Sequence, residues 1–548
     1  MQRIGRSPAR VCAGTSFETP ARSLERRGKL QQPPLLPKEG CPRQRAGWFY
    51  CPAVLRLRFG GGEVNDAKHI LESFEPLFAP KTIAVVGASA TSLAAANTFI
   101  RRMREFGYPG RIFPIHPSAD ALDGLQAYRS VADTPEPIDY LYISVPAQHV
   151  PKMLADANGR VRFAQVISSG FGEVDEGKAL QEELVRAARA GGLRLLGPNC
   201  LGMYSPRGRV TFVEDGSTEV GTVGVISQSG GLGTDIVRRG QVRGIRFSAA
   251  VTVGNSADLG PSDLLEYYLA DPQTRVIGIY MEAVRDGRRL FELLQAHRAA
   301  KPVVILKGGR TQQGRMAAAS HTGALAGDDR VWVALSRQTG CLLVDTLDQF
   351  LDTLLIFQAL RPRVDAPTRE IVMFGNGGGT SVLATDLFSR LGLDVTPFAG
   401  PTLAAMRALK LPPGSSITNP IDTPVGTLQQ EEGKIAEKIL DAIFATANPQ
   451  ALVMHLNMAA FVGRTRGDVL GNLMQAALRV ESRYPGRAHF LLVLRSDGWP
   501  EVEARKREFR DQALALGIPV YDEMMNVGWA LAALAQHERF VASRRDLP

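Results

Sequence analysis

One of the 8 histidines in this chain of 548 residues lies in the run "AAASHTGALAG" (317–327), which contains no other titratable side chain. A neutral imidazole is a nucleophile, and its phosphoramidate is labile enough to pass a phosphoryl group onward. The small flanking residues leave room for a bulky group, and no acidic residue within six positions would repel a phosphate. These features indicate that His321, in a small-residue loop, is well suited to become a phosphohistidine. The alternative interpretation is a loop histidine without a chemical role.

A histidine that attacks phosphorus needs a group that holds its other ring nitrogen, and a carboxylate is the usual one. Glu282 directly follows the strand-like run "VIGIYM" (276–281). A carboxylate at the carboxyl end of a parallel strand points into the crevice where ligands bind. Glu282 is therefore a candidate for the carboxylate that orients His321. The alternative is a solvated residue at the end of a strand.

The elements that would position these side chains are strands and helices in alternation. From about residue 78, short apolar runs alternate with amphipathic stretches, and helical stretches such as 179–192 end in glycines. This alternation predicts parallel sheets built from strand–helix–strand units. The strand-like runs before residue 200 are 82–88, 111–116, 140–146, 163–169 and 193–199.

An apolar strand, a small polar loop and a helix follow one another three times, with equivalent turn positions at Gly87, Ser229 and Gly377. The similar spacing predicts three α/β domains of similar size. Small residues at such a junction let backbone N–H groups approach an anion at the positive end of a helix. Each turn is therefore a phosphate seat or simply a tight turn. After Gly87, the run "ASATSLAAAN" lacks two glycines of the dinucleotide fingerprint, which disfavours an NAD-dependent oxidoreductase.

The basic character of the chain comes from its amino-terminal tail. Residues 1–60 carry ten Arg and two Lys against three Glu, an excess that equals the net charge of +9 of the whole chain. The rest of the chain is therefore neutral and offers no basic surface to a nucleic acid. The tail is rich in Pro, Arg and Gln, which predicts disorder for residues 1–65. A transit peptide is one interpretation of it, and a translated leader before a start near Val64 is another.

Cysteine usage and hydropathy exclude further classes of protein. Cys12, Cys41 and Cys51 lie in the tail, whereas Cys200 and Cys341 lie in the body, without the spacing of a metal site or a disulfide framework. No run of 18 apolar residues occurs. We therefore expect no metal site, no membrane-spanning segment and a cytoplasmic location.

Thirteen motifs, spread in order over about residues 75–535, resemble the NDP-forming acyl-CoA synthetases. This family comprises the succinyl-CoA synthetase α-type chains and the α half of ADP-forming acetate–CoA ligases. The motifs are "IAVVGAS", "YPGRIFPIHP", "ISVPAQHVP", "ISSGFGE", "LLGPNCLGMYSP", "GVISQSGGLG", "VTVGNSADLGPSDLLEYYLADPQT", "GIYMEAVRDGR", "KPVVILKGGRT", "AAASHTGALAG", "GNGGGTSVLATD", "LPPGSSITNPIDT" and "GIPVYD".

The resemblance implies an α/β fold of three consecutive parallel-sheet domains: a CoA-binding Rossmann-like domain (75–212) and two flavodoxin-like ligase domains (218–362 and 368–540). It also implies that His321 carries the phosphoryl group and that Glu282 orients it. The phosphate-binding residues that it implies are Ser229, Gly230 and Gly231. The implied contacts to coenzyme A are Gly87, Ala88, Ser89, Val145, Pro146, Ile167, Ser168, Ser169 and Asn199.

The reaction implied by the resemblance is reversible: a carboxylic acid, CoA and ATP give acyl-CoA, ADP and phosphate. Fused relatives continue into an ATP-grasp domain, whereas this chain stops at Pro548. We therefore expect a hetero-oligomer in which a separate ATP-grasp β subunit binds ATP or ADP together with Mg. Neither a nucleic acid nor a membrane is an expected partner.

Two departures from the family pattern weaken the implied grip on CoA. The stretch after "GAS" lacks the Lys and Gly of many relatives, and "HPS" (116–118) stands where many have "NPK". The alternative function is therefore a CoA- or acyl-CoA-binding protein that acts in regulation or assembly without turnover. The sequence leaves open which acid is used and whether the nucleotide is ADP or GDP. Residues 419–422 are a candidate lining of the acid pocket, or only a Pro-stiffened turn.

Overall fold

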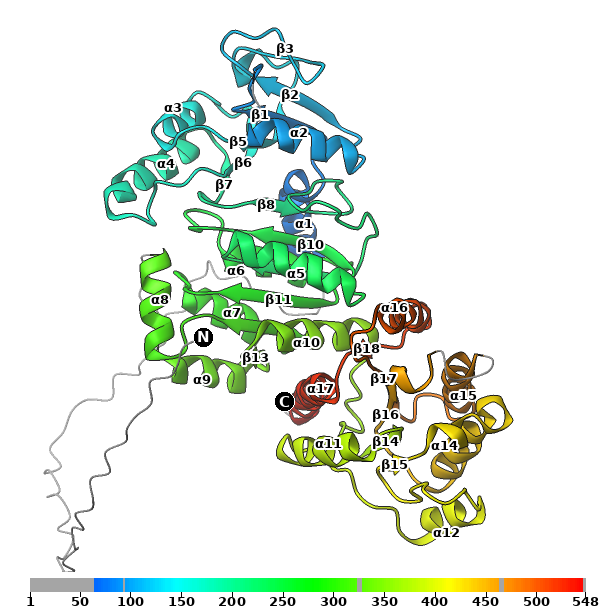
Figure 1. Ribbon diagram of the computed structural model, residues 1–548. Helices are drawn as coiled ribbons and strands as arrows, with labels where there is room; N and C mark the ends of the chain where they lie inside the picture. The colour runs from blue at the N-terminus through cyan, green and yellow to red at the C-terminus, as the bar shows by residue number, and fades with distance from the viewer. Residues whose placement is uncertain (1–63, 92–93, 323–327, 463–467, 546–548) are drawn as a thin grey trace, which may run out of the picture. The chain divides into compact units, whose positions relative to one another are not determined.

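The computed structural model describes residues 64–91, 94–322, 328–462 and 468–545. The first parallel sheet lies near the amino terminus of this part of the chain (Figure 1). Of the residues 1–65, for which we predict disorder, 1–63 lie outside the described residues, whereas Val64 and Asn65 begin a helix. Helix α1 (Val64–Phe78), which the sequence pattern did not predict, precedes the sheet. The other elements of this region are β1 (Thr82–Val86), α2 (Ala95–Glu105), β2 (Arg111–Ile115), β3 (Ala121–Leu122), β4 (Leu125–Gln126), β5 (Ile138–Ile143), α3 (Val150–Ala155), β6 (Val161–Val166), α4 (Lys178–Ala190) and β7 (Arg194–Leu196).

The second sheet carries the candidate phosphate turn, Glu282 and the helix that leads to the histidine run. An edge strand, β8, comes from the chain segment before residue 212 and pairs antiparallel with β10. The elements are β8 (Gly202–Tyr204), β9 (Val223–Ser227), α5 (Gly230–Val242), β10 (Phe247–Thr252), α6 (Pro261–Ala270), β11 (Val276–Met281), α7 (Gly287–His297), β12 (Val303–Lys307), α8 (Gln312–Thr322), α9 (Asp329–Thr339), β13 (Leu342–Val344) and α10 (Leu347–Ala359).

The third sheet follows after a short connection and ends with the longest described helix, α17. Its strands are paired in parallel throughout. The elements are β14 (Ile371–Gly375), α11 (Gly378–Arg390), α12 (Gly400–Ala408), β15 (Ile421–Asp422), α13 (Val425–Leu428), α14 (Lys434–Thr446), β16 (Ala451–Asn457), α15 (Val469–Arg483), β17 (His489–Arg495), α16 (Pro500–Ala515), β18 (Val520–Tyr521) and α17 (Met524–Arg545).

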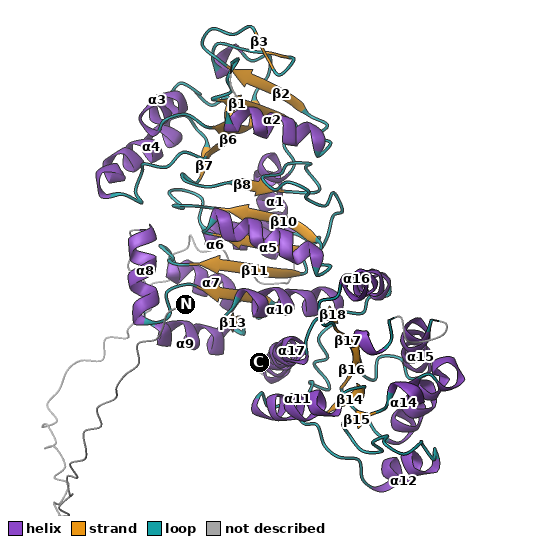
Figure 2. Cartoon of the chain, in the orientation of Figure 1, coloured by secondary structure: helices purple, strands orange, loops and turns teal. Residues whose placement is uncertain are grey.

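The three parallel sheets share one strand order. The orders are β2-β1-β5-β6-β7, β10-β9-β11-β12-β13 with β8 added beside β10, and β15-β14-β16-β17-β18. Numbered by their sequence within each sheet, the parallel strands are arranged 2-1-3-4-5, the order of flavodoxin-type doubly wound sheets. The predicted fold class is thus confirmed, and Figure 2 shows the helices and strands alternating along the chain.

Helices cover both faces of each sheet because successive strand residues point to opposite sides. In β9, Ile226 belongs to an apolar cluster that contains residues of α6, whereas Val225 belongs to a second cluster packed by α5 and α10. This second cluster also contains Met373 of β14 and Leu531 of α17. The second and third sheets therefore share one apolar core. None of the described helices combines the length and apolar character that crossing a membrane requires.

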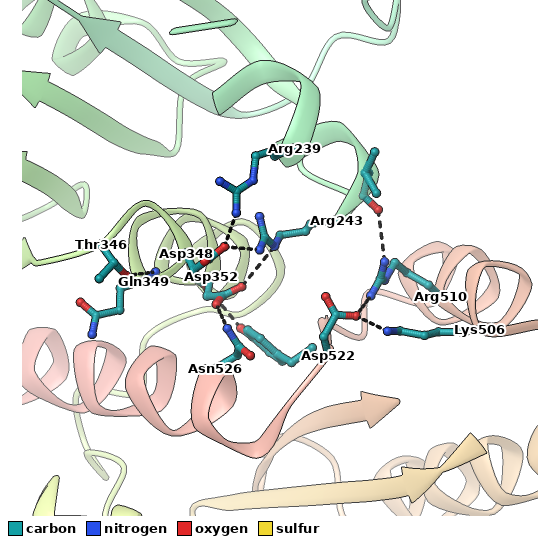
Figure 3. A network of polar contacts seen from close by, with 12 residues as sticks. Arg239, Arg243, Thr346, Asp348, Gln349, Asp352, Lys506, Arg510, Asp522 and Asn526 are labelled. Atoms are coloured by element: carbon teal, nitrogen blue, oxygen red, sulfur yellow. Dashed lines mark hydrogen bonds and ion pairs between the residues drawn. The ribbon is translucent and has the colours of Figure 1, made fainter. Parts of the chain in front are cut away.

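A polar network borders this shared core and joins helices of the second and third sheets (Figure 3). Asp352 of α10 is 3% exposed and accepts a hydrogen bond from the side chain of Asn526 of α17 at 2.5 Å. Arg243 of α5 lies 3.6 Å from the same carboxylate and also pairs with Asp348. Burial raises the pKa of Asp352 to about 6, against the lowering influence of Asn526 and Arg243.

The buried carboxylate of Asp352 should make stability depend on pH. Because its pKa is higher in the folded chain than the usual 3.8, protonation of Asp352 favours the folded state below pH 4, and this advantage is lost as the pH rises from about 4 through 6. An Asp352→Asn variant has no such group. The free energy of unfolding of this variant, minus that of the wild type, should therefore increase by up to about 3 kcal/mol as the pH rises from 4 to 7.

Thermal or urea unfolding at several pH values would measure this difference. Asp348→Asn, on the same helix but half exposed, should show a much smaller dependence. A constant difference between wild type and Asp352→Asn across this pH range would contradict the prediction.

Candidate functional site

The candidate site of the second sheet lies where β9 and β11 end. These neighbouring strands are the first and third of the sheet, and their onward connections run to opposite sides, which leaves a crevice at their carboxyl ends. Gln228, directly after β9, joins the two ends: its backbone N–H donates to the carbonyl of Tyr280 at 3.1 Å, and its side-chain oxygen accepts from the backbone N–H of Glu282 at 2.5 Å. The structure therefore brings the predicted phosphate turn and Glu282 to one switch point.

The predicted phosphate turn opens helix α5 with a capped first turn. The Ser229 hydroxyl accepts a hydrogen bond from the backbone N–H of Leu232 at 3.2 Å. A side chain on Gly230 would place its Cβ 2.8 Å from Leu201, whereas a Cβ on Gly231 would meet nothing within 4 Å. Gly230 is thus small for packing, and Gly231 leaves open space beside the positive end of the helix dipole.

A cavity of about 620 Å³ lies in front of this turn. It is lined in part by loops that come from the first sheet and in part by loops of the second. The predicted site residues that line it are Ile167, Asn199, Ser229, Gly230 and Gly231. Glu282 does not line it directly, although its neighbours Gln228 and Ala283 do.

Glu282 is held firmly at the end of β11. It is 8% exposed, so it is not the solvated strand-end residue of the alternative interpretation. The Tyr280 hydroxyl donates to one carboxylate oxygen of Glu282 at 2.8 Å, and the Lys307 ammonium donates to its backbone carbonyl at 2.7 Å. Burial, together with this carboxylate, raises the pKa of Tyr280 above its usual value of 10.0, so the phenol keeps its proton and acts as a donor.

The backbone of His321 lies in the last turn of helix α8 rather than in a loop. The alanines of 317–319 explain this, because alanine has the highest intrinsic helix propensity. The side chain of His321 and residues 323–327 lie outside what the structure describes.

The predicted CoA residues lie in the loops that follow β1, β5, β6 and β7 at the carboxyl edge of the first sheet. The first two of these strands, β1 and β5, form its switch point. Gly87 has a φ of +99°, and a Cβ there would lie 2.1 Å from the carbonyl oxygen of Ser144. The loops after the two strands therefore approach as closely as only glycine allows. The hydroxyl of Ser168 donates to the carbonyl of Val145, and the backbone N–H of Asn199 donates to the carbonyl of Ser168 at 3.1 Å.

These contacts connect the first switch point to the cavity. Asn199 lines the cavity, and its contact with Ser168 continues to Val145. Ser89, on the other side of the switch point, is held by helix α2, because its backbone N–H donates to the side chain of Asn97 at 2.8 Å. Ala88 is buried in the apolar cluster that also contains Ile226. Pro146 and Ser169 follow directly after Val145 and Ser168 in the same two loops.

The "HPS" departure keeps a turn despite its different residues. The Nδ1 atom of His116 accepts backbone hydrogen bonds from Ser118 at 3.1 Å and Ala119 at 2.8 Å. This leaves Nε2 as the nitrogen that carries the proton in the neutral ring. The histidine side chain therefore closes the turn at the carboxyl end of β2, but it supplies no lysine-type cation there.

The cavity also contains arginines that the sequence analysis missed. Arg194 pairs with Asp258 at 2.9 Å, and Arg289 is bound by acidic residues of α6. Arg285 differs: within the described residues its contacts are the carbonyls of Asn255 at 3.1 Å and Ala257 at 3.4 Å, and neither is a carboxylate. Burial lowers its pKa below the usual value. Its position three residues after Glu282 in "MEAVRDG" is the sequence signal that could have identified it.

The turn of the third sheet differs from that of the second. Its first backbone N–H, that of Gly377, already donates to the Asp422 carboxylate at 2.7 Å. Asn419 is buried, and its side chain accepts from the backbone N–H of Met373 at 3.0 Å and donates to the carbonyl of Ile371 at 2.8 Å. These contacts support the interpretation of residues 419–422 as a structural turn. Among the described residues, no group of three His, Cys, Asp or Glu side chains could hold a metal.

Comparisons with known proteins agree with this arrangement. Residues 81–206 match the CoA binding domain family, and residues 220–357 match the succinyl-CoA ligase-like flavodoxin domain family. The α subunit of acetate–CoA ligase (ADP-forming) I from Pyrococcus furiosus is 35% identical over 485 residues, which cover 86% of this chain and 100% of that protein. This chain belongs to the ADP-forming acyl-CoA synthetase family.

Other members of this synthetase family show how the likeness extends. The ADP-forming 4-hydroxybutyrate–CoA ligase of Nitrosopumilus maritimus is 31% identical over 356 residues, which cover 63% of this chain and 50% of that protein. The solved structure of the acetyl-coenzyme A synthetase 1 of Ca. Korarchaeum cryptofilum in complex with phosphate and ADP has 30% identity and a TM-score of 0.73. The structural match covers 87% of this chain and 99% of the chain of that synthetase. The predicted family is thus confirmed.

The two glycines of the phosphate turn should respond oppositely to substitution. Gly230→Ala forces Leu201 to move and should lower the melting temperature, because the new Cβ would lie 2.8 Å from its Cγ atom. Gly231→Ala enters open space in the first turn of a helix and should leave stability unchanged or raise it by up to about 1 kcal/mol. Thermal unfolding of both variants tests this, and equal destabilisation would contradict the assignment of Gly231 to the open side of the turn.

Proposed function

We propose that this chain is the CoA-binding, phosphohistidine-bearing α subunit of an ADP-forming acyl-CoA synthetase. As a member of this family it is an acid–thiol ligase, and the proposal concerns which of its residues act and how. The observation that supports it best is the shared switch point of the second sheet. There the capped phosphate turn and the buried carboxylate of Glu282 meet beside a cavity of about 620 Å³.

In the proposed reaction, phosphate attacks the thioester carbonyl of an acyl-CoA, which releases the CoA thiol and forms an acyl phosphate. A nitrogen of His321 then attacks the phosphorus, the P–O bond to the acyl oxygen breaks, and the carboxylate leaves. Glu282 holds the other ring nitrogen of His321. The backbone N–H groups of Ser229, Gly230 and Gly231 stabilise the charge on the phosphoryl oxygens, as preorganised donors do in other transfer sites. ADP takes the phosphoryl group from the histidine, and synthesis of acyl-CoA runs in reverse.

The first sheet supplies the binding site for CoA in this proposal. The residues that we expect to contact it are Gly87, Ala88, Ser89, Val145, Pro146, Ile167, Ser168, Ser169 and Asn199. The hydrogen bonds that join Val145, Ser168 and Asn199 run from the first switch point to the cavity, so the thioester end of CoA would reach the phosphate turn.

The partner follows from the similarity to α subunits. Because the P. furiosus relative is named as an α subunit, we propose that this chain works in a hetero-oligomer with an ATP-grasp β subunit. This partner would bind ATP or ADP with Mg. We further propose that the assembly acts in the cytoplasm on a small carboxylic acid.

Replacement of His321 should abolish phosphoryl transfer. In the complex with its partner, His321→Ala should lose both acyl-CoA formation, tested with a panel of carboxylic acids, CoA and ATP, and 32P labelling of this chain. His69→Ala changes an exposed histidine of α1 and should retain both. Retained labelling in His321→Ala would contradict the role of this residue.

Arg285 should contribute to anion binding in the cavity, because none of its described contacts is a carboxylate that neutralises it. Arg285→Ala should raise the KM for phosphate in the acyl-CoA-consuming direction by about tenfold, the effect of one lost charged hydrogen bond. Arg288→Ala removes an exposed arginine paired with Glu292 and is the matched control. An unchanged KM for phosphate in Arg285→Ala would contradict this role.

A further inference from the structure

Two lysines stand at opposite ends of strand β12. Lys301 lies just before the amino end of the strand, and Lys307 is its last residue. Both ammonium groups donate to backbone carbonyls. Those of Lys301 belong to Tyr268 at 2.8 Å and Asp271 at 2.6 Å, whereas Lys307 binds the carbonyl of Glu282 at 2.7 Å and that of Gly308. One lysine is therefore in contact with the candidate site, and the other has similar chemistry elsewhere.

Lys307 reaches Glu282 because β12 and β11 are neighbours. Their register pairs Lys307 with Met281, so the residue after Met281 lies beside the lysine. The side chain of Lys307 is 5% exposed, and its ammonium lies 5.4 Å from the centre of the Trp332 ring. Burial of an ammonium without a close carboxylate is energetically unfavourable. If the position served only apolar packing, an uncharged side chain would be more favourable there than Lys307.

The charges around Lys307 favour the protonated form at neutral pH. Burial lowers its pKa to about 8; the charge of Arg310 lowers it as well, whereas those of Glu282 and Asp329 oppose the decrease. The ammonium is therefore still present at pH 7, where it donates to the carbonyl of Glu282.

Three neighbouring strands thus hold Glu282 at three points. Gln228 after β9 accepts from its backbone N–H, Tyr280 of β11 donates to its carboxylate, and Lys307 of β12 donates to its carbonyl. A glutamate fixed in this way has little freedom to turn away from an imidazole. The one side chain of the three that is buried and charged is Lys307.

We propose that Lys307 is a positioning residue for phosphoryl transfer: it fixes the backbone of Glu282 so that the carboxylate faces the attacking histidine. This inference rests on the proposed function, because it assigns to Lys307 a role that it exerts only through Glu282. Lys307 itself does not line the cavity in which we expect phosphate and acyl-CoA to bind.

The test is a double-mutant cycle in the complete complex with the partner subunit. The rate measured is the labelling of this chain by [32P]phosphate with acetyl-CoA, or with whichever acyl-CoA of a panel labels the wild type fastest. Lys307→Met should lower this rate about tenfold or more with unchanged KM values. In the background of Glu282→Gln, the same substitution should change the rate by less than about twofold, because the group through which it acts is already lost.

Lys301→Met is the matched control, since it removes a lysine with the same kind of contacts and the same pKa of about 8. It should change the melting temperature as Lys307→Met does but leave the labelling rate near that of the wild type. Equal loss of rate in both lysine variants would reduce Lys307 to a stabilising residue and overturn the inference. Equal effects of Lys307→Met with and without Glu282→Gln would also overturn it.

The outcome also separates this inference from the proposed function. If the wild type is labelled and Lys307→Met labels equally fast, only the role of Lys307 fails. If no acyl-CoA of the panel labels the wild type, the proposed function fails, and the inference fails with it.

Discussion

The order of the strands in the second sheet is the constraint on which the candidate site depends. Parallel strands release their carboxyl ends at one edge, and the order 2-1-3-4-5 makes the chain leave β9 and β11 toward opposite sides. Between them remains a crevice that neither connection covers. Helix α5 begins at this crevice with the N–H groups of its first turn and the positive end of its dipole. Glu282 directly follows the adjacent strand, so the candidate phosphate turn and a buried carboxylate become neighbours without any specialised loop.

The same order occurs in the other two sheets, but the turn chemistry differs and so does what each switch point can bind. In the first sheet, Gly87 lets the two loops approach closely, which suits an extended ligand that lies across them. In the third sheet, the carboxylate of Asp422 already accepts the N–H of Gly377, so a negative charge of the protein occupies the place of an external anion. In the second sheet, the N-cap contact is the hydroxyl of Ser229, which is neutral. A shared backbone thus gives three different sites through a few side chains.

The sequence predicted the fold better than it predicted the contacts within the site. Apolar runs and glycine turns are local signals, and they identified the first-sheet strands, the strand–turn–helix units and the positions of Ser229 and Glu282 at strand ends. Helix α1 escaped because no strand pattern precedes it. Arg285 and Lys307 were not predicted because their roles depend on tertiary contacts. Arg285 binds carbonyls and no carboxylate within the described residues, and Lys307 binds a residue that follows the neighbouring strand. Only strand register places Lys307 beside Glu282, which lies 25 positions earlier in the sequence.

The two partners in the proposed phosphoryl transfer are anchored to very different degrees. Glu282 is bonded to three strands of a sheet whose cores continue into the neighbouring domains. Helix α8, which leads to His321, has little apolar anchorage: of residues 312–318 only Ala318 is buried, and Met316 is 69% exposed. Segments with few buried contacts open at low free-energy cost. Since the proposed reaction requires the histidine to meet an acyl phosphate and then a nucleotide on another subunit, a rigid acceptor carboxylate and a weakly anchored histidine helix are the combination that this chemistry needs.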